Sequence, residues 1–184
     1  STLLLAPAIV IGVSCFFYSK EFMDLIYKEH INESAAIFGL IMLSFVAVST
    51  TYIFGTLLTA NGNMKHLNIM AAFGMIVNVS LNLVLIPDLK AYGSAISSLI
   101  TQFLTAIIQV IIAQRIFKFK VNYRLINTFI MFTIGVISIN YAAFRVLPFH
   151  WMINFSIMVS ICLGWALVSG MISPKAIFRL LKYG

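Results

Sequence analysis

The segment VNVSLNLVLIPDLKAYGSAISS, residues 77–98, joins two strongly apolar runs of this chain. Two asparagines, Asn78 and Asn82, lie four residues apart in a run that is otherwise almost entirely aliphatic. Proline stops a helix and glycine permits a turn, so Pro87 and Gly93 predict two helices joined as a hairpin. A buried amide without a partner is costly, so both asparagines need either a structural partner or a function.

The composition of the whole chain predicts a membrane protein. Of its 184 residues 61% are hydrophobic and only 9% are charged, and the mean hydropathy is +1.03. An average soluble domain is about 45–50% apolar and about 25% charged. The net charge of +7 is spread over short loops rather than gathered in one patch, which argues against nucleic acid as a partner. Cys15 and Cys162 lie inside apolar runs and are interpreted as packing residues.

Six stretches are apolar and long enough to cross a membrane as helices, which predicts an all-α integral membrane protein. Their ranges are approximately 2–18, 35–59, 67–86, 92–116, 125–146 and 152–172. Ser173 and Pro174 begin a tail, residues 173–184, that is either a short helix in the cytoplasmic interface or a disordered end. The chain begins Ser-Thr-Leu without a methionine, and we interpret Ser1 as an internal position of a longer protein.

The distribution of Lys and Arg predicts the orientation of these spans. Eight of the 12 basic residues fall on one side of the predicted membrane, namely Lys65, Arg115, Lys118, Lys120, Arg124, Lys175, Arg179 and Lys182. The other side receives Lys20, Lys28, Lys90 and Arg145 together with all five acids. Cytoplasmic loops carry the excess of basic residues, so the first side, the start of the chain and the C-terminal tail are expected to be cytoplasmic.

Polar residues inside the second, third and fourth spans repeat at helical spacing. The three stripes are Ser44, Thr51, Gly55 and Thr59; Asn68, Ala71, Met75, Asn78 and Asn82; and Ser94, Ser98, Gln102, Thr105 and Gln109. Small and amide-bearing side chains are typical of seams between membrane helices, but they can also line a polar pathway. Both interpretations remain open. We further predict that Asn82 pairs with Gln102 and locks the hairpin.

Catalytic chemistry has little support in the sequence. No Asp, Glu, Lys or His lies in the middle of a predicted span, and no catalytic, metal-binding or phosphate-binding motif is recognisable. We therefore expect no enzyme, no cofactor and no metal site. The only cluster of acids is Glu21, Asp24, Glu29 and Glu33, spaced as the wet face of an outer-surface helix with Phe22, Leu25 and Ile26 opposite.

Residues 78–101, NVSLNLVLIPDLKAYGSAISSLIT, resemble the signature of polysaccharide flippases in the multidrug/oligosaccharidyl-lipid/polysaccharide exporter superfamily. The matching residues are Asn78, Asn82, Leu85, Ile86, Pro87, Gly93, Ser94 and Ala95. The preceding GTLLTANGNMKHLNI, residues 55–69, is similar to the helix–loop–helix of that family, and the resemblance covers about residues 20–116. The chain departs from the pattern at Lys90-Ala91-Tyr92 and at Ser94, where alanine is usual.

The resemblance implies a transporter of twelve or fourteen helices, built as two lobes around a cavity, in which this chain is the C-terminal part. It implies that lipid-linked oligosaccharide crosses the inner (plasma) membrane by alternating access, for polysaccharide, O-antigen or capsule export. The implied partners are that substrate, membrane lipids and the missing N-terminal lobe. Alternatives are a cation-coupled multidrug exporter of the same superfamily, a membrane-embedded sugar or acyl transferase, and a purely structural membrane subunit.

Overall fold

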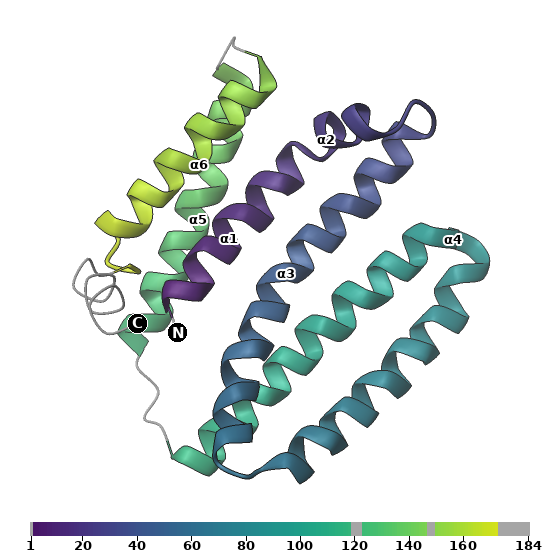
Figure 1. Cartoon of the computed structure of the whole chain (residues 1–184), viewed down its shortest axis with the longest axis vertical. Helices are drawn as coiled ribbons and strands as arrows, with labels where there is room; N and C mark the ends of the chain where they lie inside the picture. The colour runs from purple at the N-terminus through teal and green to yellow at the C-terminus, as the bar shows by residue number, and fades with distance from the viewer. Residues whose placement is uncertain (1, 119–122, 147–149, 173–184) are drawn as a thin grey trace. The chain divides into compact units, whose positions relative to one another are not determined.

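The computed structural model describes residues 2–118, 123–146 and 150–172. These residues form six helices, and no strand occurs among them (Figure 1). The helices are α1 (Thr2–Phe17), α2 (Ser19–Ile26), α3 (Ile31–Ala60), α4 (Met64–Phe117), α5 (Tyr123–Val146) and α6 (Trp151–Val168). The all-α class predicted from the sequence is therefore confirmed.

Several of the helices are long and apolar enough to cross a membrane. Four satisfy this criterion, namely α3, α4, the portion Ile126–Arg145 of α5, and α6. A fifth is added if α1 and α2, which are separated only by Tyr18, form one broken span. These lengths and compositions fit a membrane-embedded protein.

The chain divides into two compact units. The first unit contains α1, α5 and α6, which pack against one another. Its buried interior includes Ile9, Phe132, Val136 and Met158, and the ring of Tyr18 meets other aromatic rings edge-on. The second unit contains α2, α3 and α4, and α3 packs against both of the others.

Helix α4 is a hairpin rather than one straight rod. Its 54 residues would extend about 81 Å if straight, whereas the hydrocarbon core of a bilayer is about 30 Å thick. The backbone breaks at Lys90, where φ is 50° and ψ is −130°. Residues 64–89, here the first half, and residues 91–117, the second half, run back along each other on either side of that bend (Figure 1).

The sequence predicted this hairpin with a turn between Pro87 and Gly93, and the bend at Lys90 lies within that range. The expected stop at Pro87 is wrong, because α4 continues through Pro87 and becomes non-helical only at Lys90. Pro87 occupies the last turn of the first half and has no N–H, so the one helical hydrogen bond that it would donate, to the Leu83 carbonyl, is lost close to the bend. Gly93 does not supply the turn either, since its φ is not positive. Gly93 is buried, and a Cβ added to it would lie 2.5 Å from the Leu85 carbonyl oxygen, so its role is close backbone approach.

The observed helix ends differ from the predicted spans by as much as four residues. Helix α3 begins at Ile31 rather than at residue 35, and α6 ends at Val168 rather than at residue 172. The early end of α6 has a local cause. Gly170 adopts the left-handed conformation, with φ of 73°, and its N–H bonds to the Leu167 carbonyl, which is how glycine terminates helices. The predicted tail, residues 173–184, lies outside the described residues.

Helix α2 carries only Glu21 and Asp24 of the predicted acidic face, since Glu29 lies between α2 and α3 and Glu33 is in the first turn of α3. Its buried face also differs from the prediction. Met23 is buried and the ring of Phe22 contacts Phe38 of α3. Leu25 and Ile26, expected on the inner face, are each 65% exposed. The short helix has room for only one turn of contact with α3, and that contact is made by Phe22 and Met23.

Candidate functional site

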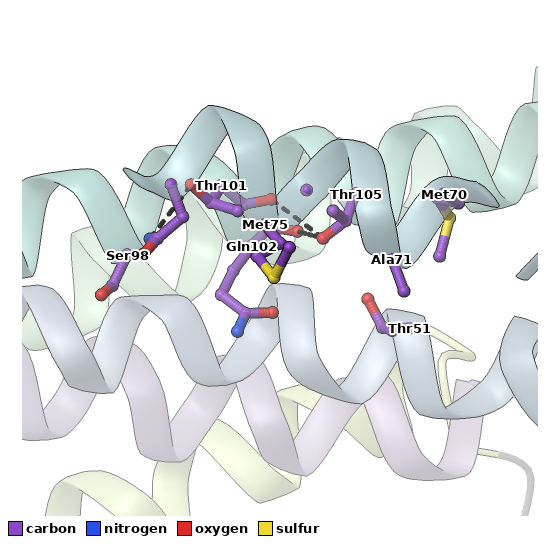
Figure 2. Close-up of a pocket in the computed structure, with 10 residues that line it drawn as sticks. Thr51, Met70, Ala71, Met75, Ser98, Thr101, Gln102 and Thr105 are labelled. Carbon is purple, nitrogen blue, oxygen red and sulfur yellow. Dashed lines mark hydrogen bonds between the residues drawn. The ribbon is translucent and has the colours of Figure 1, made fainter. Parts of the chain in front are cut away.

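A polar pocket of about 520 Å³ lies in the second unit, between α3 and the two halves of α4. Figure 2 shows most of its lining side chains converging from these three segments. The lining residues are Thr51 of α3; Met70, Ala71, Gly74, Met75 and Asn78 of the first half; and Ser98, Thr101, Gln102 and Thr105 of the second half. None of the ten is ionisable, and six carry a hydroxyl or an amide.

Residues of all three polar stripes noted in the sequence are among those that line this pocket. One residue of the α3 stripe, three of the first-half stripe and three of the second-half stripe line it, namely Thr51; Ala71, Met75 and Asn78; and Ser98, Gln102 and Thr105. The structure thus brings parts of all three stripes to one place. Sequence reasoning missed Met70, Gly74 and Thr101. Gly74 is three residues after Ala71 and Thr101 is three after Ser98, so both belong to the predicted faces.

A fixed antiparallel register of α4 sets the geometry of the pocket. Asn78 Nδ2 donates to Thr101 Oγ1 at 3.3 Å, which joins the two halves directly. One turn away, Gly74 is buried so closely against Thr105 that an added Cβ would lie 2.7 Å from Thr105 Cγ2. Glycine therefore allows the halves to approach, and the amide–hydroxyl bond then ties them together.

The predicted pairing of Asn82 with Gln102 is wrong. Asn82 Nδ2 donates instead to Asn78 Oδ1 at 2.9 Å, within its own helix face, and Asn78 makes the bond across the hairpin. The partner is Thr101 because it lies level with Asn78 in the antiparallel register. Counted outward from Pro87 and Gly93, Asn82 lies five residues away and Gln102 nine, so these two are not level, whereas Asn78 lies nine and Thr101 eight residues away.

Gln109 forms a second polar connection, from α4 to the backbone of α3. Its side chain is 1% exposed. With the amide oriented to satisfy both groups, Nε2 donates to the Thr51 carbonyl at 3.2 Å and Oε1 accepts from the Gly55 N–H at 3.0 Å. The amide can come this close only because residue 55 is glycine, since an added Cβ would lie 2.8 Å from the same amide atom that accepts from the Gly55 N–H. Gln109 is therefore a helix-seam residue and does not line the pocket.

Thr51 occupies a special position beside this seam. Its carbonyl accepts from Gln109, while the residue is also one of those that line the pocket. Thr51 Oγ1 is buried and has no hydrogen-bond partner among the described residues. By contrast, Thr105 Oγ1 donates to the Thr101 carbonyl at 2.9 Å and so is partly satisfied by its own helix. Protein atoms cover Thr51 Oγ1, so this hydroxyl is an unpaired group of the helix seam rather than a contact open to the pocket.

The remaining predicted site residues lie away from the pocket. Ser44 Oγ donates to the Ile41 carbonyl of its own helix at 2.6 Å. Thr59 is exposed near the end of α3. Pro87 is exposed beside the bend, and Gly93 is buried against Leu85. These four residues shape helices or helix contacts rather than the pocket.

The first unit contains a polar cluster that sequence reasoning did not single out. Asn140 of α5 is fully buried, and its Nδ2 donates to the Val136 carbonyl at 2.8 Å and lies 3.5 Å from Cys162 Sγ of α6. A Cβ added to Gly135 would lie within 3 Å of the indole of Trp165. The signal in the sequence is an asparagine in the middle of an apolar span. These contacts join α5 to α6, just as Gln109 joins α4 to α3 in the second unit.

Among the described residues no three His, Cys, Asp or Glu side chains gather as metal ligands do. Comparisons of this chain with known protein families, with curated proteins and with solved structures give no match. The interpretation of the pocket therefore depends on its own chemistry.

Proposed function

We propose that this chain is the C-terminal, six-span part of a membrane transporter that moves lipid-linked oligosaccharide across the membrane by alternating access. The observation that carries the proposal is the polar pocket between α3 and the α4 hairpin. It offers about 520 Å³ of space lined by neutral hydroxyl and amide groups, within helices that are otherwise apolar. The resemblance of residues 78–101 to the polysaccharide flippases supports the same function.

The chemistry of the pocket suits sugars. Hydroxyl and amide side chains both donate and accept hydrogen bonds, as sugar hydroxyls do. A cationic drug or a coupling proton would instead favour a carboxylate, and no lining residue has one. The proposal is accordingly transport of a neutral, polar group rather than cation-coupled drug export or catalysis.

Two neighbouring alanines provide a matched test. Ala71 and Ala72 are both exposed, and only Ala71 lines the pocket. The chain, joined to the N-terminal lobe that we propose precedes it, is expressed in a cell lacking its own flippase, and polysaccharide export is measured. Ala71→Phe should fill the pocket and abolish export at normal protein abundance, whereas Ala72→Phe should leave export unchanged. Normal export by Ala71→Phe, or equal loss in both variants, contradicts the proposal.

The proposed orientation places the loop after α4 in the cytoplasm and the segment around α2 outside. Cys15→Ala and Cys162→Ser remove both native thiols, the second while keeping a polar partner for Asn140. Single cysteines are then introduced at Lys28 and Lys118 and treated with a membrane-impermeant thiol reagent on intact cells. We expect labelling at position 28 only. Labelling at position 118 but not at 28 reverses the orientation.

A further inference from the structure

A second, apolar groove of about 360 Å³ lies between the two halves of α4. Its lining residues are His66, Ile69, Met70, Phe73, Ile108 and Ile112. Five of these six side chains are apolar, and His66 is at one end. The groove therefore has no hydrogen bonds to offer along its length, and inside a bilayer its natural occupant is a hydrocarbon chain.

The groove is on the opposite side of the hairpin contact from the polar pocket. Each helical residue is rotated about 100° from the one before it. Measured from Met70, which lines both cavities, Ala71 and Met75 are turned one way by about 100° and 140°. Ile69 and Phe73 are turned the other way by about 100° and 60°. An occupant of the groove is thus separated from the transport pocket by the Met70–Gly74 contact line.

Basic side chains surround the open end of this groove. The antiparallel register that places Asn78 opposite Thr101 also brings the level of His66 close to that of Arg115. Lys65, His66, Arg115 and Lys118 are all exposed at this end of the second unit. The nearest acid along α4, Asp88, is 22 residues from His66, or about 33 Å along the helix. Positive charge at this end is therefore not balanced by any nearby carboxylate of α4.

We propose that the groove binds an anionic phospholipid of the surrounding bilayer. One acyl chain lies along Ile69, Phe73 and Ile112, and the headgroup phosphate is held between Lys65 and Arg115. Guanidinium and ammonium groups form charge-assisted hydrogen bonds with phosphate oxygens, and basic pockets between membrane helices select anionic headgroups. An apolar groove with a basic rim fits an anionic lipid. A free phosphate would not contact the apolar groove, and a zwitterionic lipid would not match the positive charge of the rim.

The test measures lipid retention by the purified full chain with native mass spectrometry, in mixed micelles containing equal amounts of phosphatidylglycerol and phosphatidylcholine. We expect preferential retention of phosphatidylglycerol. Lys65→Gln with Arg115→Gln should lower that preference about fivefold for each charge removed. The control Lys20→Gln with Lys28→Gln removes the same charge from the other end and should change nothing.

A second pair of variants tests the tail contacts. Ile112 lines the groove and its neighbour Ile111 does not. Ile112→Trp should fill the groove and abolish retention of either lipid, whereas Ile111→Trp should retain both, and thermal unfolding confirms that both variants fold. The proposal is overturned by equal retention of the two lipids, by an unchanged preference in the Lys65/Arg115 variant, or by retention in Ile112→Trp. Dimers cross-linked through position 73 would instead assign the groove to a second copy of the chain.

Discussion

The two sides of the α4 hairpin are built from the same two helix halves and differ in what they offer. On the side facing α3, hydroxyls and amides line a pocket, and Gln109 connects α4 to the α3 backbone. On the other side, isoleucine and phenylalanine line a groove. Burying apolar surface gives little stability in a bilayer, because lipid tails are equally apolar. The hairpin is therefore held by its glycines and amides, and its apolar side is left for lipid.

The largest effect should come from crowding the close contact between Gly93 and the Leu85 backbone, where the two halves of α4 meet beside the bend. Gly93→Ala places a Cβ 2.5 Å from the Leu85 carbonyl oxygen, and backbone cannot move aside as a flexible side chain can. Overpacking of this kind costs about 1–3 kcal/mol. The free energy of unfolding, measured by denaturant titration in micelles, should fall by that amount. Gly164→Ala is the control, because nothing lies within 4 Å of its added Cβ. Equal stability of the two variants would show that closure of the hairpin does not depend on glycine at position 93.

The next effect should be confined to the polar side. Gln109→Ala removes two hydrogen bonds to α3, and Gly55→Ala pushes the same amide away. Each should lower the free energy of unfolding by about 1–2 kcal/mol, given that bonds between membrane helices contribute about 0.6 to 1.7 kcal/mol. The double variant should be no less stable than either single variant, since both substitutions disrupt the same contact between the Gln109 amide and the α3 backbone. Gln114→Ala, at an exposed position of α4, is the matched control. Additive losses would disprove the pairing.

A smaller difference should distinguish the two asparagines. Asn78→Leu removes the bond to Thr101 across the hairpin and should cost about 0.6–1.7 kcal/mol. Asn82→Leu removes only a bond within one helix face, and Asn82 Oδ1 is already buried without a partner among the described residues. It should therefore cost less than Asn78→Leu in the same unfolding assay. A larger loss at Asn82 would show that it has a partner across the hairpin after all.

The smallest effect should come from the apolar side. Ile69 lines the groove and is 60% exposed within the chain, so a lipid tail can occupy the space that Ile69→Ala vacates. The free energy of unfolding should change by less than about 0.5 kcal/mol, as at other surface positions. Comparison of Ile69→Ala with Gln109→Ala in one assay measures the difference between the two sides directly. Comparable losses would mean that the hairpin is stabilised by apolar burial.

The fold class and the converging polar faces were predictable because both follow from periodicity. A spacing of three and four residues defines a helix face wherever the helix begins, and Thr51, Asn78 and Gln102, one from each predicted face, line one pocket. The predicted partner across the hairpin was wrong for a simpler reason. Lys90, the residue that bends, is midway between Pro87 and Gly93, but Asn82 and Gln102 lie at different distances from it and so are not level. The seam of Gln109 with Gly55 depends on how two separate helices pack, which no local pattern encodes.

Lys90 also has a consequence for the order of events during folding. Its φ of 50° and ψ of −130° resemble the first central position of a type II′ turn, which glycine normally occupies, so a lysine there is strained. Partners across the hairpin are eight residues apart at Leu85 and Gly93 and 23 apart at Asn78 and Thr101. Short loops close with the least entropic cost, so the halves should join progressively outward from the bend. The strained residue thus lies at the first step, where it governs the rate of assembly more than the path taken.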